Sequence, residues 1–209
     1  MAIRLGANSP AFRVGSQTPS RIFLGPNQVW PEFIAVPQQF STAGAFSYTI
    51  PTNCLFLDII VLGSGACGKG MGFIDVWGNG GGAGQWNGVT LRRGVDLPWT
   101  TTSITGTVGA GRASNGQGAS LAGNPTTATI AGVGTLTGAG GAAAGNSGTT
   151  AGQGSGNFTF NGIVYAGSAN QTSIGGNGNP PGGGGASHTI TFGSGGAGAN
   201  GTVWIRAYI

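Results

Sequence analysis

The stretch LFLDIIVL at residues 55–62 runs without a break into GSGACGKG at residues 63–70. The first half is apolar almost throughout, which is typical of a β-strand that is buried on both faces. Half of the second stretch is glycine, and each interior glycine costs an α-helix about 1 kcal/mol relative to alanine. The junction therefore predicts a central strand that leads into a glycine-rich, non-helical segment.

The rest of the chain has the same character. Glycine accounts for 46 of the 209 residues, and all but four of these glycines lie in residues 63–201. No strict Gly-X-Y register holds, which excludes collagen, and no apolar run approaches the ~18 residues of a membrane-spanning helix. Hydrophobic residues still make up 39% of the chain, with ten Phe and five Trp. Disordered chains are poor in aromatic residues, so we expect an ordered, all-β fold.

Short segments with a β pattern recur along the chain. The segment FTFNGIVY at residues 158–165 predicts a hairpin, because an Asn-Gly turn separates two β-prone runs. In the last segment, Val203, Ile205, Ala207 and Ile209 share one face, and we expect this strand to pair near residues 55–62. The other predicted strands are residues 46–50, 89–92, 100–108, 127–130 and 189–192. Together these segments predict a glycine-rich β-sandwich-like domain over residues 32–209.

Several glycines recur at a spacing of three, for example Gly195, Gly198 and Gly201. A polyproline II helix repeats every three residues and has no internal hydrogen bonds. Glycine at every third position would let such helices approach closely and bond to one another through their backbones. The alternative is that these stretches are long turns and loops, and the spacing alone does not choose between the two.

Residues 1–31 have a different composition, with prolines at positions 10, 19, 26 and 31 and isolated apolar side chains. Such a segment cannot bury itself, so we interpret it as an extended docking arm that lies on another protein. The residues expected to make this contact are Arg4, Phe12, Arg13, Arg21, Phe23, Leu24 and Trp30.

The formal charge is +4, but residues 113–205 carry no charged side chain. A nucleic-acid-binding protein gathers its cations on one face, so we expect no nucleic-acid partner. The two cysteines, Cys54 and Cys67, are interpreted as free and buried, and the single histidine leaves no set of metal ligands. We predict neither a metal nor a cofactor.

Two phosphate-binding patterns overlap at Gly63–Lys69, namely G-x-G-x-x-G and G-x-x-x-x-G-K. The residue after Lys69 is Gly70, so the hydroxyl that binds Mg²⁺ in such motifs is missing. The glycines that follow cannot easily start the helix that holds the phosphate. We therefore interpret the match as a chance occurrence in a glycine-rich sequence.

The sequence evidence for a catalytic site is equally weak. The four acidic residues are dispersed, and no G-x-S-x-G elbow occurs. We expect the protein not to be an enzyme. The alternative, an enzyme that acts on a cell envelope, would depend on Asp75, Asp96 and His188.

Three side chains set in glycine loops are candidates for contact with an external ligand. Trp77 and Trp86 flank residues 78–84, and His188 lies in another uncharged loop. Loop tips often carry binding residues, and a Trp ring can stack on a sugar or lie on lipid. Each Trp ring could equally cover its own backbone.

Four segments of the chain resemble the glycine-rich minor tail proteins of long-tailed bacteriophages, especially those that infect mycobacteria and related actinobacteria. The N-terminal element RIFLGPNQVW at residues 21–30 is similar to one near the start of such proteins. The pair formed by residues 46–50 and 55–65 is similar to their opening strands. Residues 87–91 with 105–111 resemble their middle strands, and GTVWIR at residues 201–206 resembles their last strand.

The resemblance implies a structural protein of the virion tail tip with a role in attachment to the host surface. It also implies synthesis in the host cytoplasm and release by lysis, which needs no export signal. Expected partners are other tail-tip proteins, sister copies in a homo-oligomer such as a trimer, and a glycan or lipid of the host envelope.

Overall fold

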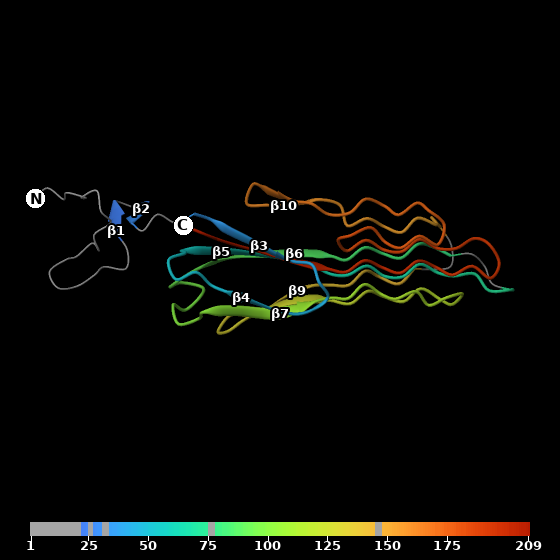
Figure 1. The fold of residues 1–209 in the computed structure, drawn as a ribbon, viewed down its shortest axis with the longest axis horizontal. Coiled ribbons are helices and arrows are strands. Elements are labelled where there is room, and N and C mark those ends of the chain that lie inside the picture. Colours follow the sequence, from blue (N-terminus) through green and yellow to red (C-terminus); the bar gives the residue numbers. More distant parts are fainter. Residues whose placement is uncertain (1–21, 25–26, 31–33, 75–77, 145–147) are drawn as a thin grey trace, which may run out of the picture.

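The computed structural model describes residues 22–24, 27–30, 34–74, 78–144 and 148–209, and its regular elements there are all β-strands. Two four-stranded antiparallel sheets form the body of the molecule (Figure 1). The first contains, in spatial order, β3 (Val36–Phe40), β12 (Thr202–Tyr208), β5 (Phe56–Leu62) and β6 (Trp86–Arg92). The second contains β4 (Gly44–Thr49), β7 (Ser103–Val108), β8 (Thr126–Ile130) and β9 (Gly134–Gly138).

Two further pairs of strands are short. β1 (Ile22–Leu24) pairs with β2 (Asn27–Trp30) within the predicted docking arm. β10 (Phe158–Phe160) pairs with β11 (Ile163–Tyr165) and forms the predicted hairpin. Asn161 and Gly162 have φ values of 47° and 74°, which is the left-handed conformation that a two-residue Asn-Gly turn requires.

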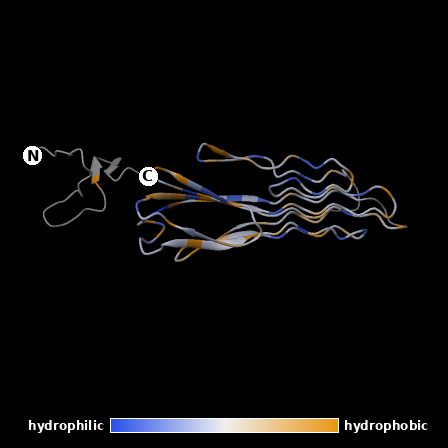
Figure 2. Ribbon diagram, viewed as in Figure 1, coloured by the Kyte–Doolittle hydropathy of each residue, from blue (hydrophilic) through white to orange (hydrophobic). Residues whose placement is uncertain are grey.

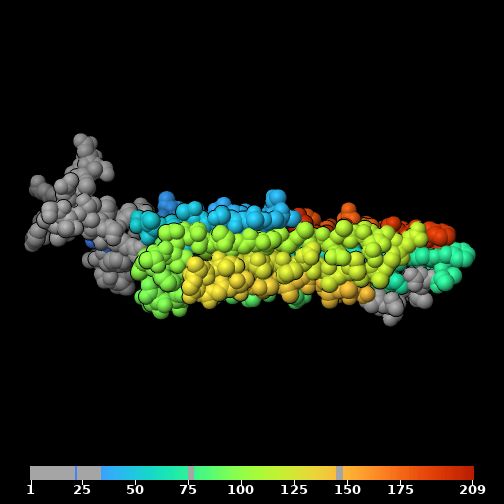
Figure 3. Space-filling view, turned by 90° about the horizontal axis from the view of Figure 1, so that it is seen from below, coloured from blue at the N-terminus to red at the C-terminus, as the bar shows by residue number. Residues whose placement is uncertain are grey.

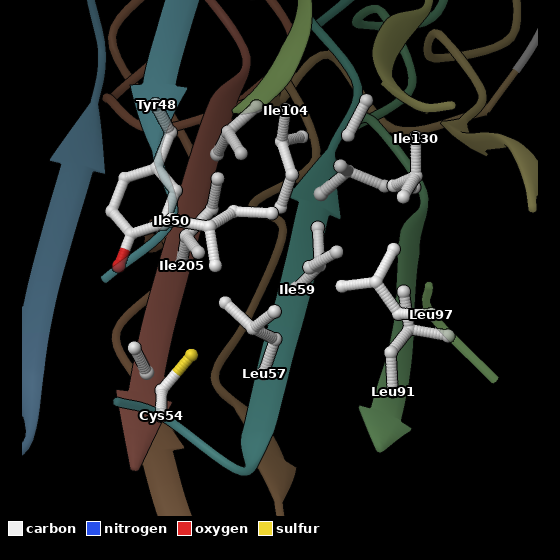
Figure 4. Packing of buried hydrophobic residues seen from close by; sticks show 14 of the residues in the cluster. Tyr48, Ile50, Cys54, Leu57, Ile59, Leu91, Leu97, Ile104, Ile130 and Ile205 are labelled. Carbon is white, nitrogen blue, oxygen red and sulfur yellow. The ribbon is translucent and has the colours of Figure 1, made fainter. Parts of the chain in front are cut away.

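The two sheets pack face to face around one hydrophobic core (Figure 4). The first sheet contributes alternate residues of its central strands, and the second sheet contributes side chains from β4, β7 and β8. The central members are Leu57, Ile59, Val61, Val203 and Ile205 on one side and Tyr48, Ile104, Val108, Ala128 and Ile130 on the other. This arrangement confirms the prediction of an all-β, sandwich-like domain.

The predicted return of the last strand is also confirmed. β12 pairs antiparallel with β5 along its whole length, with Val203 opposite Val61 and Ala207 opposite Leu57. Residues 57–62 are all buried, including Asp58 and Ile60, which point away from the core. Those two are covered because the β10–β11 hairpin lies over the outer face of the first sheet.

The glycine-rich segments are the connections at one end of the sandwich. Residues 63–85 join β5 to β6, residues 109–125 join β7 to β8, and residues 166–201 join β11 to β12. In Figure 1 these connections run side by side as undulating segments beyond the sheets, and Figure 3 shows that the result is one elongated rod. We call this group of glycine-rich connections the bundle.

Segment 63–71 lies at the centre of the bundle and bonds to its neighbours with a repeat of three. Its successive backbone N–H groups donate in turn to segments 79–85, 118–124 and 193–199, and the cycle then starts again. The acceptors for residues 63 to 71 are, in order, the carbonyls of Gln85, Asn124, Ala199, Gly82, Leu121, Gly196, Asn79, Gly118 and Gly193. A repeat of three residues with bonds only between segments is the pattern of polyproline II helices packed together, so we call segment 63–71 the central helix.

Three other segments donate back to the same helix, so it is surrounded on all sides. Gly141, Arg112 and Gly185 donate their N–H groups to the carbonyls of Ser64, Gly65 and Ala66. A Cβ atom on Gly195, Gly198 or Gly201 would lie within 3.0 Å of the backbone of residues 62–69. The spacing of three therefore marks the positions where two backbones touch, and the alternative of loose loops is wrong for these segments.

One predicted strand is absent. Residues 189–192 form a turn, and Phe192 has a φ of 67°. The alternating sequence TITF is typical of a strand, but a strand also needs a neighbouring strand to bond with, and this segment lies at the far end of the bundle. Conversely, β3 and β9 were not predicted. In β3, Pro37 and polar residues weaken the alternating apolar pattern of a strand, and in β9 the glycines do so.

Candidate functional site

The far end of the bundle, which we call the tip, contains two loops that lie side by side. Residues 71–74 leave the central helix, and residues 188–193 connect two outer segments of the bundle. Met71 donates its N–H to the carbonyl of Gly193 over 2.9 Å, and the rings of Phe73 and Phe192 stack with centroids 5.8 Å apart. These contacts fix the two loops to each other.

The tip exposes large apolar side chains. Phe73 and Ile74 are 77% and 92% exposed, and Ile190 and Phe192 are exposed as well. Ile174 joins them, because the next residue, Gly175, donates its N–H to the carbonyl of Ser187. Figure 2 shows hydrophobic residues at this end of the molecule. We call Phe73, Ile74, Ile174, Ile190 and Phe192 the tip residues.

His188 organises the second loop from within. Its Nδ1 accepts a hydrogen bond from the N–H of Ile190 over 3.2 Å, and its own N–H donates to the carbonyl of Lys69. The ring occupies space beside Gly175 and Gly193, where added Cβ atoms would collide with it. The predicted contact residue is thus half-buried and supports the loop that carries Ile190 and Phe192.

Trp86 lies in a different place, at the start of β6 on the outer face of the first sheet. Its ring stacks between Phe158 of the hairpin and Trp204 of β12, at centroid distances of 5.3 and 5.1 Å. Its Nε1 donates to the carbonyl of Ser155 over 2.9 Å. The ring and the polar edge of Trp86 are therefore engaged within the protein. This agrees with the interpretation that the ring packs on its own chain and does not contact an external ligand. Trp77 lies outside the described residues.

A polar cluster under the hairpin surrounds Asp58. Its Oδ1 accepts hydrogen bonds from side chains on three elements, while its Oδ2 lies 3.9 Å from Nη1 of Arg206. The donors to Oδ1 are Thr90 at 2.7 Å, Asn161 at 2.9 Å and Tyr208 at 3.1 Å. Burial and the nearby Asp58 carboxylate raise the pKa of both Tyr165 and Tyr208. The cluster holds the hairpin against the sheet.

A groove of about 520 Å³ runs along the outer face of β3 and β12, beside the hairpin. Trp204 and Tyr165 form its aromatic wall, and Gln38, Gln39 and Arg206 supply its polar groups. The Arg206 charge is balanced by the buried Asp58 carboxylate, so the groove has no strong electrostatic preference.

Of the residues named for the enzyme alternative, the two that the structure describes, Asp96 and His188, do not come together. Asp96 accepts the N–H of Arg92 in the turn after β6, and β6 runs away from the bundle. His188 is at the opposite end of the rod, and Asp75 lies outside the described residues. The phosphate-like motif is the central helix itself, where the N–H groups of residues 63–71 all bond to neighbouring carbonyls.

Cys54 and Cys67 are buried and form no disulfide, as predicted. Cys67 Sγ accepts the N–H of Leu121 inside the bundle, whereas Cys54 lies at the other end of β5. Within the described ranges, no three His, Cys, Asp or Glu side chains gather as metal ligands. The described residues also contain no helix that is long and apolar enough to cross a membrane.

The predicted anchoring residues lie largely beyond the described ranges. Arg4, Phe12, Arg13 and Arg21 are outside them, and Phe23, Leu24 and Trp30 belong to β1 and β2. Sequence reasoning also missed the tip residues. Their only signal was a single large apolar residue, or a pair, set between glycines and polar residues, and the same signal marks core positions elsewhere in the chain.

Comparison with known proteins agrees with these features. A family model described as a glycine-rich domain matches residues 41–208. The Gene 32 protein of Mycobacterium phage D29 is 43% identical over 201 residues, which cover 90% of each chain. The Gene 32 protein of Mycobacterium phage L5 is 45% identical over 123 residues, or 56% of each chain. The chain is thus a phage-encoded homologue of the mycobacteriophage Gene 32 proteins and belongs to the glycine-rich domain family.

Proposed function

We propose that this protein is a minor tail protein of the virion, located at the tail tip, with a role in attachment to the host surface. The observation that carries the proposal is that the two ends of the rod differ. The chain enters the sandwich at Ile34 and β3, beside the C-terminal end of β12, and the exposed tip residues are at the other end. An adhesive fibre needs such an arrangement, with one end for the particle and one for the cell.

The uncharged surface supports the same role. Residues 113–205 have no formal charge, whereas a soluble protein surface is normally rich in charged side chains. Such a surface tends to associate, so we propose that the flank of the bundle contacts sister copies or neighbouring tail-tip proteins. The bundle itself is rigid because its backbone groups bond from one segment to the next. The proposal assigns the protein no catalytic step.

Labelling of intact virions tests the location. A gold-conjugated antibody against the sandwich should decorate the distal end of the tail in electron micrographs. Particles that lack residues 1–31 of this chain should have lost the label, while the purified truncated protein keeps its thermal unfolding transition. Label on the capsid, or purified virions without the protein, would contradict the proposal. Truncated protein that still enters particles would place the anchor elsewhere.

A further inference from the structure

We propose that the tip residues insert into a lipid surface. The inference rests on the proposed host-facing orientation of the rod and names the material that the tip contacts. It concerns Phe73, Ile74, Ile174, Ile190 and Phe192, which are all exposed at the end of the bundle.

The tip is built to display these side chains. Phe192 holds a φ of 67°, a conformation that costs a non-glycine residue roughly 1–3 kcal/mol and persists only where the surroundings enforce it. The enforcing contacts are the Met71–Gly193 bond, the turn between Gly193 N–H and the Ile190 carbonyl, and a bond from Gln117 Nε2 to the Phe192 carbonyl. The strained backbone places the Phe192 ring at the tip, where it stacks on Phe73 and stays 60% exposed.

The shape of the tip favours lipid over a protein partner. The apolar residues sit on the convex end of a rod, and none of them lines a described pocket. Five partly exposed side chains of about 150 Å² each offer about 500 Å² of apolar surface, a patch of the size that marks a protein or membrane contact site. Insertion into lipid needs no complementary surface, so a small convex patch is sufficient.

The charge distribution agrees with this choice. The described tip residues carry no formal charge, and Lys69, the charged residue of the central helix, is only 5% exposed. Because a charged side chain must lose its hydration to enter an apolar layer, these five uncharged side chains can enter lipid without that cost. The binding should therefore depend little on lipid headgroup charge or on salt.

Co-flotation of the full-length protein with vesicles tests the inference. We expect similar binding to phosphatidylcholine vesicles and to vesicles with added phosphatidylglycerol, unchanged between 0.1 and 1 M salt. A triple variant, Phe73→Ser, Ile190→Ser and Phe192→Asn, should lose at least tenfold in partitioning, since each large apolar side chain contributes strongly to transfer. Asn replaces Phe192 because it tolerates a positive φ. A double variant at exposed apolar sites away from the tip, Val95→Ser and Val164→Ser, should bind like the parent protein.

Three results would overturn the inference. The first is parent protein that stays unbound to both vesicle types, and the second is a triple variant that still binds. The third is binding that requires phosphatidylglycerol and disappears in high salt. Sedimentation of the parent and triple variant decides whether the tip instead pairs with a second copy, in which case a dimer would dissociate on substitution. Each outcome is independent of the virion-labelling result, so the tail location can stand if lipid insertion fails.

Discussion

The Nδ2 atom of Asn161, in the turn of the β10–β11 hairpin, donates a 2.9 Å hydrogen bond to Oδ1 of Asp58 in the centre of β5. The two residues are 103 positions apart in the chain, and Thr90 and Tyr208 donate to the same oxygen. A fully buried carboxylate thus joins the hairpin to three strands of the first sheet.

Replacement of Asp58 by Ala should lower the free energy of unfolding by about 2–4 kcal/mol, because three part-buried donors and the Arg206 guanidinium lose their acceptor. Chemical denaturation measures the loss. The matched variant Asn161→Ala removes one donor and should cost only about 1 kcal/mol. Equal losses for the two variants would show that Asp58 does not coordinate the cluster.

The pairing of β5 with β12 and the Asn-Gly hairpin could be predicted because each depends on a local pattern, either an apolar run or a turn dipeptide. The conformation of the glycine-rich segments could not be predicted in this way. Whether Gly195, Gly198 and Gly201 lie in loops or helices depends on neighbours that are more than 100 residues away in the sequence, such as Gly65 and Gly68. The tip was missed for a similar reason, since exposure of Phe73 or Phe192 depends on where the bundle ends.

Close backbone packing predicts an unusual sensitivity to alanine. In a Gly198→Ala variant, the new Cβ would collide with the Gly65 carbonyl and its neighbours, and rigid backbones on both sides cannot move apart. We expect a loss of at least about 3 kcal/mol, as for other severe overpacking, or failure to fold. Thermal unfolding followed by circular dichroism measures it.

The matched control is Gly162→Ala. Gly162 has a φ of 74°, but nothing lies within 4 Å of its Cβ position. This substitution adds the strain of a left-handed alanine without a collision, so its cost should stay near 1–2 kcal/mol. If both variants are equally stable, the helices of the bundle do not pack as closely as described.

Ionisation of the Tyr48 phenol should make the stability of the fold depend on pH in the alkaline range. Burial, with a smaller contribution from Cys54, raises the pKa of Tyr48 to about 12 from its usual value of 10. Below pH 10 the phenol is neutral in the folded and unfolded states, so its contribution is constant. Between pH 10 and 12 only the unfolded chain ionises, and stability should fall by about 2–3 kcal/mol.

The variant Tyr48→Phe separates this effect from general alkaline denaturation. The Tyr48 hydroxyl is buried without a hydrogen-bond partner among the described residues, so its removal should leave stability at pH 8 unchanged or raise it by about 1 kcal/mol. The decline between pH 10 and 12 should become shallower in denaturation curves recorded at each pH. An identical decline in both proteins would assign it to other groups.

His188 provides a test of how the tip is held. In a His188→Ala variant, the Ile190 N–H loses its acceptor, and the space between Gly175 and Gly193 is left unfilled. The central helix keeps its other bonds, so the melting temperature should change by only a few degrees. Hydrogen exchange should nevertheless accelerate at residues 188–193 and remain slow at residues 63–70, and vesicle binding should weaken because Ile190 and Phe192 are no longer held outward. Unchanged exchange at residues 188–193 would show that the other contacts of the loop, such as the Met71–Gly193 and Gln117–Phe192 bonds, hold it without the histidine.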